Sequence, residues 1–253
     1  MRIVVKVGSA VLTQDGEVAL ERMQALVTFL AELKENNEVL LVSSGAVSAG
    51  YTELKLDRTI LSNKQALAAI GQPILLGKYA KKFAYFNILT SQVLVTSVNL
   101  KKKDDIQRIK DTVNTLLLNG VVPIINENDA TSTDELEVGD NDQLSAYIAK
   151  NTDADMLIIL SDIDAYYDAD PRVDSNAKAL KIVHEITPDE LSRKATPNDV
   201  FATGGIVTKL KAANYLLESG IDMFLASGFD LSDVKSFTLK KIHKGGTLFR
   251  RIK

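Results

Sequence analysis

The 253-residue sequence contains no cysteine and no tryptophan. Without cysteine the chain forms no disulfide, offers no thiolate to a metal and has no cysteine nucleophile. No apolar run approaches the roughly 20 residues that a membrane-spanning helix needs. The first residues enter a strand-like pattern directly and show no signal-peptide pattern. These absences predict a cytoplasmic protein with no membrane partner.

A large net charge is also missing. The formal net charge is −3, with 45% hydrophobic and 25% charged residues, which is typical of a globular chain. Such a balance gives no general attraction to nucleic acids. The lysine run 101–103 is followed at once by Asp104 and Asp105, a pattern that favours the solvated start of a helix over a basic patch. We therefore expect no nucleic-acid partner, and any phosphate must be bound by a local arrangement.

Short β-branched runs alternate with longer helical patterns along the chain. This alternation is typical of βαβ units in an α/β protein with a mainly parallel sheet. The pattern predicts strands at 2–7, 38–42, 88–95, 121–125, 156–160 and 221–226. It predicts helices at 17–35, 63–82, 104–119, 142–150 and 209–219. We expect one domain with two lobes, residues 1–150 and 151–253.

Two polar segments follow the first two strands. Lys6 and Gly8 end the first strand, where a buried lysine is costly unless an anion meets it; the alternative is a lysine that reaches solvent. Ser43-Ser44-Gly45 joins a strand to a helix, an arrangement that suits either an anion or plain N-capping. A serine-hydrolase turn needs G-x-S-x-G, and the spacing around Ser48 has one residue too many.

Two further segments are rich in the same residue types. Residues 126–130 (NENDA) follow a predicted strand, and 139–142 (GDND) open a predicted helix. Their oxygens could bind an amino acid or Mg²⁺, whereas helix caps and turns would explain only one of the two groups. Residues 203–209 (TGGIVTK) combine exposed backbone N–H groups with a hydroxyl and a lysine, which favours phosphate binding over a flexible turn.

Taken together, these segments resemble the amino-acid kinase family, and within it the branch that phosphorylates free glutamate. The matching segments are KVGS (6–9), VSSGAVSAG (42–50), KQALAAIGQ (64–72), PIINENDA (123–130), VGDND (138–142), LSDIDAYYDADPR (160–172), TGGIVTK (203–209) and GTLF (246–249). They stand in the family's order. INENDA with GDND favours this branch over the aspartate, acetylglutamate, carbamate and uridylate kinases.

The resemblance implies a three-layer αβα sandwich around a mainly parallel sheet, the amino-acid kinase fold. It implies phosphorylation of the γ-carboxylate of L-glutamate by ATP, the first step of proline biosynthesis. Mg²⁺ would be carried mainly by the ATP phosphates, with no separate metal site on the protein. It further implies feedback inhibition by proline and a homo-oligomer.

The resemblance also assigns roles to individual residues. Lys6 and Lys209 would flank the transferred phosphoryl group, with Asp142 holding both lysines in place. Ser44, Asp129 and Asn141 would bind glutamate. The nucleotide would contact Lys6, Gly8, Ser161, Asp162, Thr203, Gly204, Gly205, Ile206, Val207, Thr208 and Lys209. No general base is needed, because the attacking carboxylate is already ionised at neutral pH.

Three features depart from the family pattern. Ala10 stands where a hydroxyl is common, and Ile206 and Val207 replace a methionine and a small residue. The sequence also lacks the C-terminal RNA-binding-like domain of many relatives, so we expect the short form. Two alternatives stay open: another acyl-phosphate-forming amino-acid kinase, such as one for acetylglutamate, and a catalytically silent amino-acid sensor. Retention of both lysines, Asp142 and Asp162 argues against the sensor.

Overall fold

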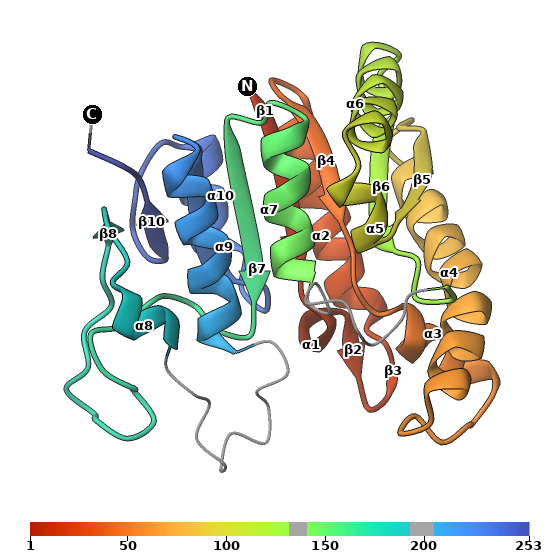
Figure 1. The fold of residues 1–253 in the computed structure, drawn as a ribbon, viewed down its shortest axis with the longest axis horizontal. Coiled ribbons are helices and arrows are strands. Elements are labelled where there is room, and N and C mark those ends of the chain that lie inside the picture. Colours follow the sequence, from red (N-terminus) through yellow and green to blue (C-terminus); the bar gives the residue numbers. More distant parts are fainter. Residues whose placement is uncertain (132–140, 193–204, 253) are drawn as a thin grey trace.

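The computed structural model describes residues 1–131, 141–192 and 205–252 (Figure 1). Its main feature is an eight-stranded sheet with the strand order β5-β6-β4-β1-β7-β9-β10-β8. The strands are β1 (Arg2–Val7), β4 (Glu38–Val42), β5 (Thr90–Val95), β6 (Val122–Glu127), β7 (Met156–Ser161), β8 (Ile182–Val183), β9 (Asp222–Ser227) and β10 (Thr247–Phe249).

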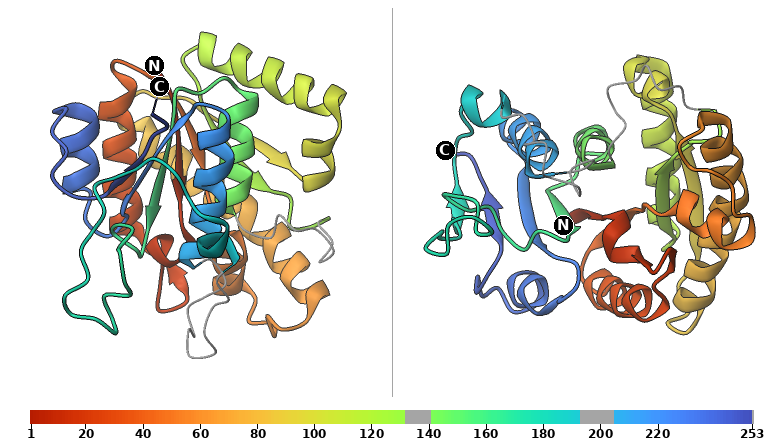
Figure 2. Two further views of the ribbon diagram at one scale, coloured as in Figure 1. Left: turned by 60° about the vertical axis from the view of Figure 1, so that its left-hand side comes forward. Right: turned by 90° about the horizontal axis from the view of Figure 1, so that it is seen from below.

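Helices cover both faces of this sheet, which confirms the expected three-layer αβα architecture (Figure 2). One layer contains α2 (Leu20–Lys34), α4 (Leu61–Ala84) and α10 (Ser232–Leu239). The other contains α6 (Lys103–Leu118), α7 (Asn141–Asn151) and α9 (Ile206–Glu218). Four short helices join these elements: α1 (Ser9–Leu12), α3 (Ala46–Glu53), α5 (Ser97–Lys101) and α8 (Pro188–Ser192).

The strands are apolar throughout because each side of the sheet meets a helix layer. Val5 of β1 packs into the core beneath α2 and α4, while its neighbour Val4 packs into the core beneath α7 and α9. Successive side chains of a strand point to opposite faces, so a strand buried on both sides reads as a continuous apolar run. None of the helices in the described ranges is both long and apolar enough to cross a membrane.

The centre of the sheet positions the candidate site. β1 pairs in parallel with β4 on one side and with β7 on the other, so their carboxyl ends lie at one edge. The chain leaves β1 toward β4 first and returns to β7 later, so the strand order reverses at β1. Ligands of open α/β sheets bind at such a reversal, beyond the carboxyl ends of the strands. β10 runs antiparallel to β9, so the sheet is mainly rather than wholly parallel, as expected.

One expected helix begins later in the structure than the sequence pattern predicted. The helix expected at 17–35 begins at Leu20, because residues 13–18 form a small hairpin of β2 (Thr13–Gln14) and β3 (Glu17–Val18). Asp15 and Gly16 both have positive φ in its two-residue turn, a conformation that an Asp-Gly pair favours. Helix α3 directly follows the Ser-Ser-Gly segment, which confirms the helix expected after that segment.

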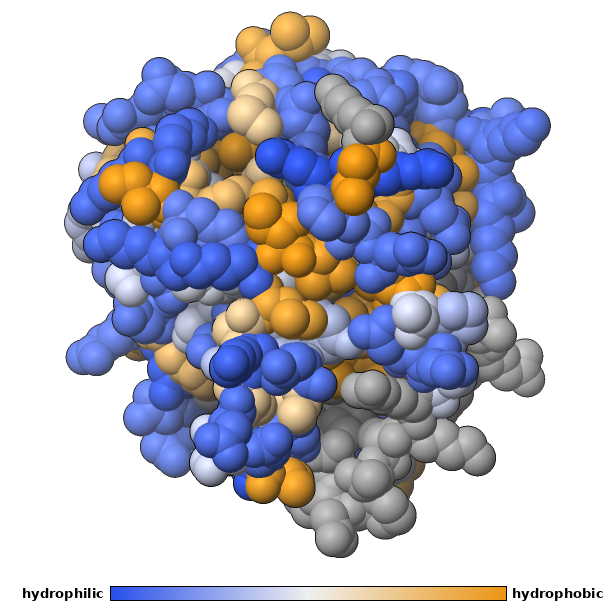
Figure 3. Space-filling model, turned by 90° about the vertical axis from the view of Figure 1, so that its left-hand side faces the viewer, coloured by the Kyte–Doolittle hydropathy of each residue, from blue (hydrophilic) through white to orange (hydrophobic). Residues whose placement is uncertain are grey.

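The edge of the sheet that carries β8 has a mixed surface, with apolar patches among polar ones (Figure 3). Ile182 of β8 is half exposed. The edge strand itself is only two residues long. A short edge strand offers few free backbone groups to another chain, which limits edge-to-edge pairing.

Candidate active site

A pocket of about 390 Å³ lies at the carboxyl ends of β1, β4, β6 and β7. Its lining residues are Lys6, Gly8, Ser9, Ala10, Ser44, Gly45, Ala46, Val47, Ser48, Asn126, Glu127, Asp129, Asn141, Ser161, Asp162 and Lys209. Each of the polar segments singled out in the sequence contributes to this pocket. The predicted nucleotide contacts Thr203 and Gly204 lie outside the described residues, as do Gly139 and Asp140.

One buried ionic cluster lies at the pocket floor. Nζ of Lys6 contacts Oδ1 of the Asp142 carboxylate, and Nζ of Lys209 lies 3.1 Å from Oδ2. Lys6 is 4% exposed, Lys209 2% and Asp142 0%. Burial alone would raise the pKa of Asp142, but the two ammonium groups outweigh burial and hold that pKa below its usual range. These three side chains by themselves carry a formal charge of +1, and both lysines line the pocket.

Thr208 is a further donor to this carboxylate. Its Oγ1 donates to Oδ2 of Asp142 at 2.9 Å and lies 2.9 Å from the Gly205 carbonyl oxygen. The sequence analysis assigned Thr208 to the nucleotide, and it did not predict this contact with Asp142. Ile206 and Val207 start α9 and are not among the residues that line the pocket in the described part.

In the described ranges, three helices begin at residues that line this pocket. α1 starts after Gly8, α7 starts at Asn141, and α3 starts after Gly45, whose φ of 95° lies in the left-handed region that favours glycine. The first turn of α9 adds Lys209 to the lining. The first turn of a helix carries free backbone N–H groups and the positive end of the helix dipole. Together with the ionic cluster, these helix starts make the pocket suitable for anions.

The end of the pocket near β4 and β6 is built from amides and carboxylates. Nδ2 of Asn141 lies 2.7 Å from the Ser43 carbonyl oxygen, 2.9 Å from Ser44 Oγ and 3.0 Å from Asn126 Oδ1. Burial, and then the nearby charge of Glu127, raise the pKa of Asp129 to about 6. Asn126 and Glu127 had been noted only as part of the NENDA segment, and the sequence gave them no role.

The opposite end of the pocket lies beyond β7. Ser161 is buried at the end of that strand and donates to Asp162 Oδ1 at 2.8 Å. Gly8 donates its backbone N–H to the Leu160 carbonyl oxygen at 3.0 Å, so this N–H is already used. Gly8 therefore contributes space beside Lys6 rather than a donor.

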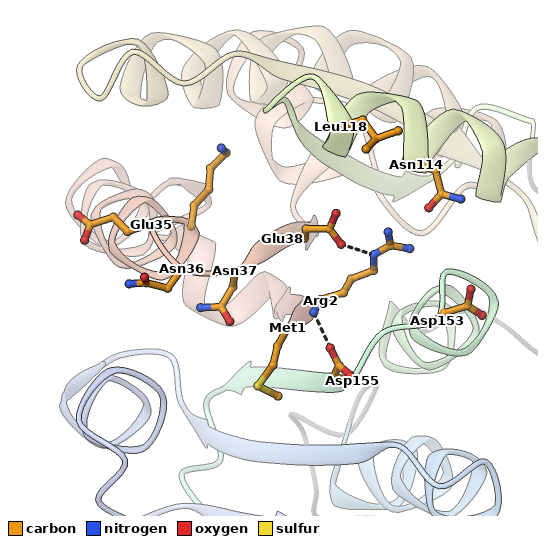
Figure 4. A pocket seen from close by; sticks show the side chains of 11 residues that line it. Met1, Arg2, Glu35, Asn36, Asn37, Glu38, Asn114, Leu118, Asp153 and Asp155 are labelled. Carbon is orange, nitrogen blue, oxygen red and sulfur yellow. Dashed lines mark hydrogen bonds and ion pairs between the residues drawn. The ribbon is translucent and has the colours of Figure 1, made fainter.

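A wider depression of about 820 Å³ lies at the other end of the sheet (Figure 4). Arg2 is at its centre, with Nε donating to Glu38 Oε2 at 2.9 Å and its backbone N donating to Asp155 Oδ2 at 2.6 Å. These charges pair with one another. No helix start adds donors there in the described ranges. We therefore place the candidate active site at the carboxyl edge.

No group of three or more histidine, aspartate or glutamate side chains in the described residues is arranged to hold a metal ion. Asp142 in particular is engaged by two ammonium groups. The described pocket lining includes the cations Lys6 and Lys209 as well as the carboxylates of Glu127, Asp129 and Asp162.

Known proteins resemble this chain over most of its length. The model of the amino acid kinase family matches residues 1–227. A glutamate 5-kinase of Wolinella succinogenes is 50% identical, covering 98% of this chain and 97% of that protein. A glutamate 5-kinase of Leishmania donovani is 49% identical, covering 98% of this chain and 94% of that protein.

Solved structures share the fold at much lower identity. The isopentenyl phosphate kinase of T. acidophilum has a TM-score of 0.69 and 16% identity, covering 99% of this chain and all of the other. Such a likeness concerns the fold alone. With the family model spanning nine-tenths of the sequence and a relative at 50% identity over nearly the whole chain, the protein belongs to the amino acid kinase family.

Proposed function

We propose that this chain is an ATP-dependent glutamate 5-kinase. It transfers the γ-phosphoryl group of ATP to the side-chain carboxylate of L-glutamate, giving L-glutamyl 5-phosphate and ADP. The buried cluster of Lys6, Asp142 and Lys209 at the floor of a polar pocket carries the proposal. The names of the relatives at 49–50% identity support the choice of substrate.

The cluster suits phosphoryl transfer, which needs positioning and charge neutralisation more than covalent chemistry. Lys6 comes from β1 and Lys209 from α9, and both contact the carboxylate of Asp142, so the two ammonium groups are held in place before the substrates arrive. Preorganised charge of this kind stabilises the transition state without reorganisation. Mg²⁺, carried by the ATP phosphates, would supply further neutralisation of their negative charge.

The two ends of the pocket suit the two substrates. We assign the end near β4 and β6 to glutamate, with Asp129 pairing the α-ammonium group and Ser44 and Asn141 binding its other polar groups. We assign the end beyond β7 to ATP, with Ser161, Asp162 and Lys209 beside the phosphates. This division follows the proposed lobes 1–150 and 151–253. Gly8 and residues 203–208 complete the proposed nucleotide contacts.

Three properties accompany this proposal. Proline shares an α-carboxylate and an α-nitrogen with glutamate, so it should compete for the glutamate end as a feedback inhibitor. The protein should be a cytoplasmic enzyme of proline biosynthesis and a homo-oligomer. Initial rates with millimolar proline at low glutamate test the first property. Light scattering of the purified chain tests the oligomer.

A hydroxylamine trap for acyl phosphate tests the function itself. The protein is incubated with ATP, Mg²⁺ and glutamate, N-acetylglutamate or aspartate. Acetylation removes the charge that Asp129 would pair, and a site built around a polar group rejects analogues lacking it by about 10⁴-fold. Aspartate is one methylene shorter, so it should fail to bring its carboxylate to the phosphorus while its α-groups are bound.

Glutamate alone should therefore give hydroxamate. Equal turnover of N-acetylglutamate would make an acetylglutamate kinase the better assignment. Glutamate binding without any acyl phosphate would favour the silent sensor. Asp129→Asn tests the assignment of Asp129 to glutamate, because this variant should weaken glutamate turnover while leaving KM for ATP unchanged.

A further inference from the structure

Helix α4 provides none of the lining residues found for the pocket in the described part of the chain. Two of its buried side chains nevertheless reach the loop after β4 and the end of β6, which do line the pocket. These side chains are Tyr79 and Gln72, which lie two turns apart on α4. Their contacts lie beside the glutamate end.

Tyr79 acts on the loop after β4. Its hydroxyl oxygen lies 3.0 Å from Ser43 Oγ, and Ser43 Oγ donates to the Ser44 carbonyl oxygen at 3.1 Å. A serine hydroxyl has one proton, so Tyr79 is the donor to Ser43. Burial raises the pKa of Tyr79 well above its usual range, which keeps this proton in place. The two hydroxyls thus fix the peptide group of Ser44.

Gln72 acts on the end of β6. Its Nε2 donates to the Glu127 carbonyl oxygen at 3.1 Å, and its Oε1 accepts from Asn126 Nδ2 at 3.3 Å. Asn126 in turn accepts from Asn141 at 3.0 Å. Gln72 therefore holds the Asn126 amide together with the Glu127 backbone N–H, which donates to Asn126 Oδ1 at 2.9 Å, and through Asn126 it supports the amide of Asn141.

We propose that Tyr79 and Gln72 are positioning residues for the amino-acid substrate. They hold Ser44 and Asn141 in a binding geometry without contacting the substrate themselves. This inference rests on the proposed function, which places glutamate at this end of the pocket. The ionic cluster of Lys6, Asp142 and Lys209 receives no hydrogen bond from either residue in the described structure. Their loss should therefore affect glutamate binding and spare ATP.

Tyr79→Phe removes one oxygen and keeps the buried ring. KM for glutamate should rise about five-fold, the effect of one lost hydrogen bond, while KM for ATP and kcat stay within two-fold. Tyr85→Phe is the matched control, because Tyr85 lies just beyond α4 and is 74% exposed. It should behave as the wild type. Gln72→Met removes the amide at similar length and should also raise KM for glutamate.

A double-mutant cycle separates positioning from general damage. Ser43→Ala should raise KM for glutamate, and adding Tyr79→Phe to it should raise KM no further, because both act through one hydrogen-bonded chain. Thermal midpoints monitor folding of each variant. An additive double variant, or a rise in KM for ATP equal to that for glutamate, overturns the inference.

The kinetics also distinguish failure of the inference from failure of the proposed function. An unchanged KM for glutamate in Tyr79→Phe and Gln72→Met, with normal wild-type turnover, overturns the inference alone. A wild type that forms no acyl phosphate from glutamate overturns the proposed function and this inference with it.

Discussion

Nζ of Lys209 lies 3.1 Å from Oδ2 of Asp142, and Lys6 contacts the other oxygen of the same carboxylate. Burying a charge costs several kcal/mol unless it is paired, and here one buried carboxylate contacts both lysines. The arrangement is asymmetric. Removing one lysine leaves the other in contact with Asp142, whereas removing the aspartate takes this carboxylate away from both lysines.

Lys6→Met and Lys209→Met should each lower kcat by at least about 10²-fold, because each removes preorganised charge from the transition state. Methionine fills the space of the lysine stem, and the remaining lysine still pairs Asp142, so the fold should persist. Steady-state kinetics and circular dichroism check this prediction. Near-normal turnover in a folded variant would remove that lysine from the mechanism.

Asp142→Asn should be the least stable variant of the cluster. Removing one partner of a buried ion pair costs about 3–5 kcal/mol, because an uncompensated charge stays behind. Urea unfolding at pH 7 measures this loss beside both lysine variants. A stability equal to that of Lys6→Met would contradict the asymmetry.

The pH dependence of the same variant has a defined sign. The pKa of Asp142 is lowered in the folded state, so its ionisation stabilises the fold above its ordinary pKa of 3.8. That stabilisation is lost as the pH falls through the lowered value. The wild type should therefore lose more stability than Asp142→Asn on acidification below about pH 4. Parallel acid titrations of unfolding midpoints measure the difference.

Asp129→Asn should stabilise the protein while weakening glutamate binding. The pKa of Asp129 rises from 3.8 to about 6 on folding, so its charge destabilises the folded state above pH 6. A pKa rise of this size lowers the free energy of unfolding by about 3 kcal/mol at most, and the partial exposure of Asp129 reduces this loss toward 1 kcal/mol. Below pH 3.8 the effect should vanish, because both states bind the proton.

The matching activity prediction concerns substrate affinity. Protonated Asp129 cannot pair the α-ammonium group, so wild-type KM for glutamate should rise as the pH falls below about 6. KM for ATP over the same pH range is the control.

Unfolding of the wild type and of Asp129→Asn at pH 7.5 and at pH 3.5 tests the stability effect. A destabilised Asp129→Asn variant at pH 7.5 would show that this carboxylate has a structural partner.

Two glycines of α4 should respond oppositely to alanine. A Cβ at Gly71 would lie 1.8 Å from the Ala46 carbonyl oxygen of α3, whereas a Cβ at Gly77 would meet nothing within 4 Å. Gly77→Ala should stabilise the helix by up to about 1 kcal/mol, since alanine is the better helix former. Gly71→Ala should push α3 away and cost about 1–3 kcal/mol or more. Thermal unfolding of the two variants compares them directly.

Much of this architecture could be predicted from local sequence. Periodicity distinguishes strands from helices, and turn chemistry marks where each strand ends, because both depend on neighbours only a few residues away. Lys6, Ser44 and Ser161 were therefore placed at strand ends from the sequence, and the parallel sheet implied that these ends share one edge. The family resemblance added their proposed roles.

Only the tertiary structure decided which side chains meet. Asp142 is 136 residues from Lys6 and 67 from Lys209, and the Tyr79–Ser43 pair spans 36. Such contacts depend on strand order and on how closely the helices pack. The Asp15-Gly16 hairpin was missed because backbone pairing outweighed the helical pattern there. The antiparallel strand β10 was missed because a short apolar run is ambiguous. Periodicity fixes which face of an element is buried, but three-dimensional packing selects the partners on that face.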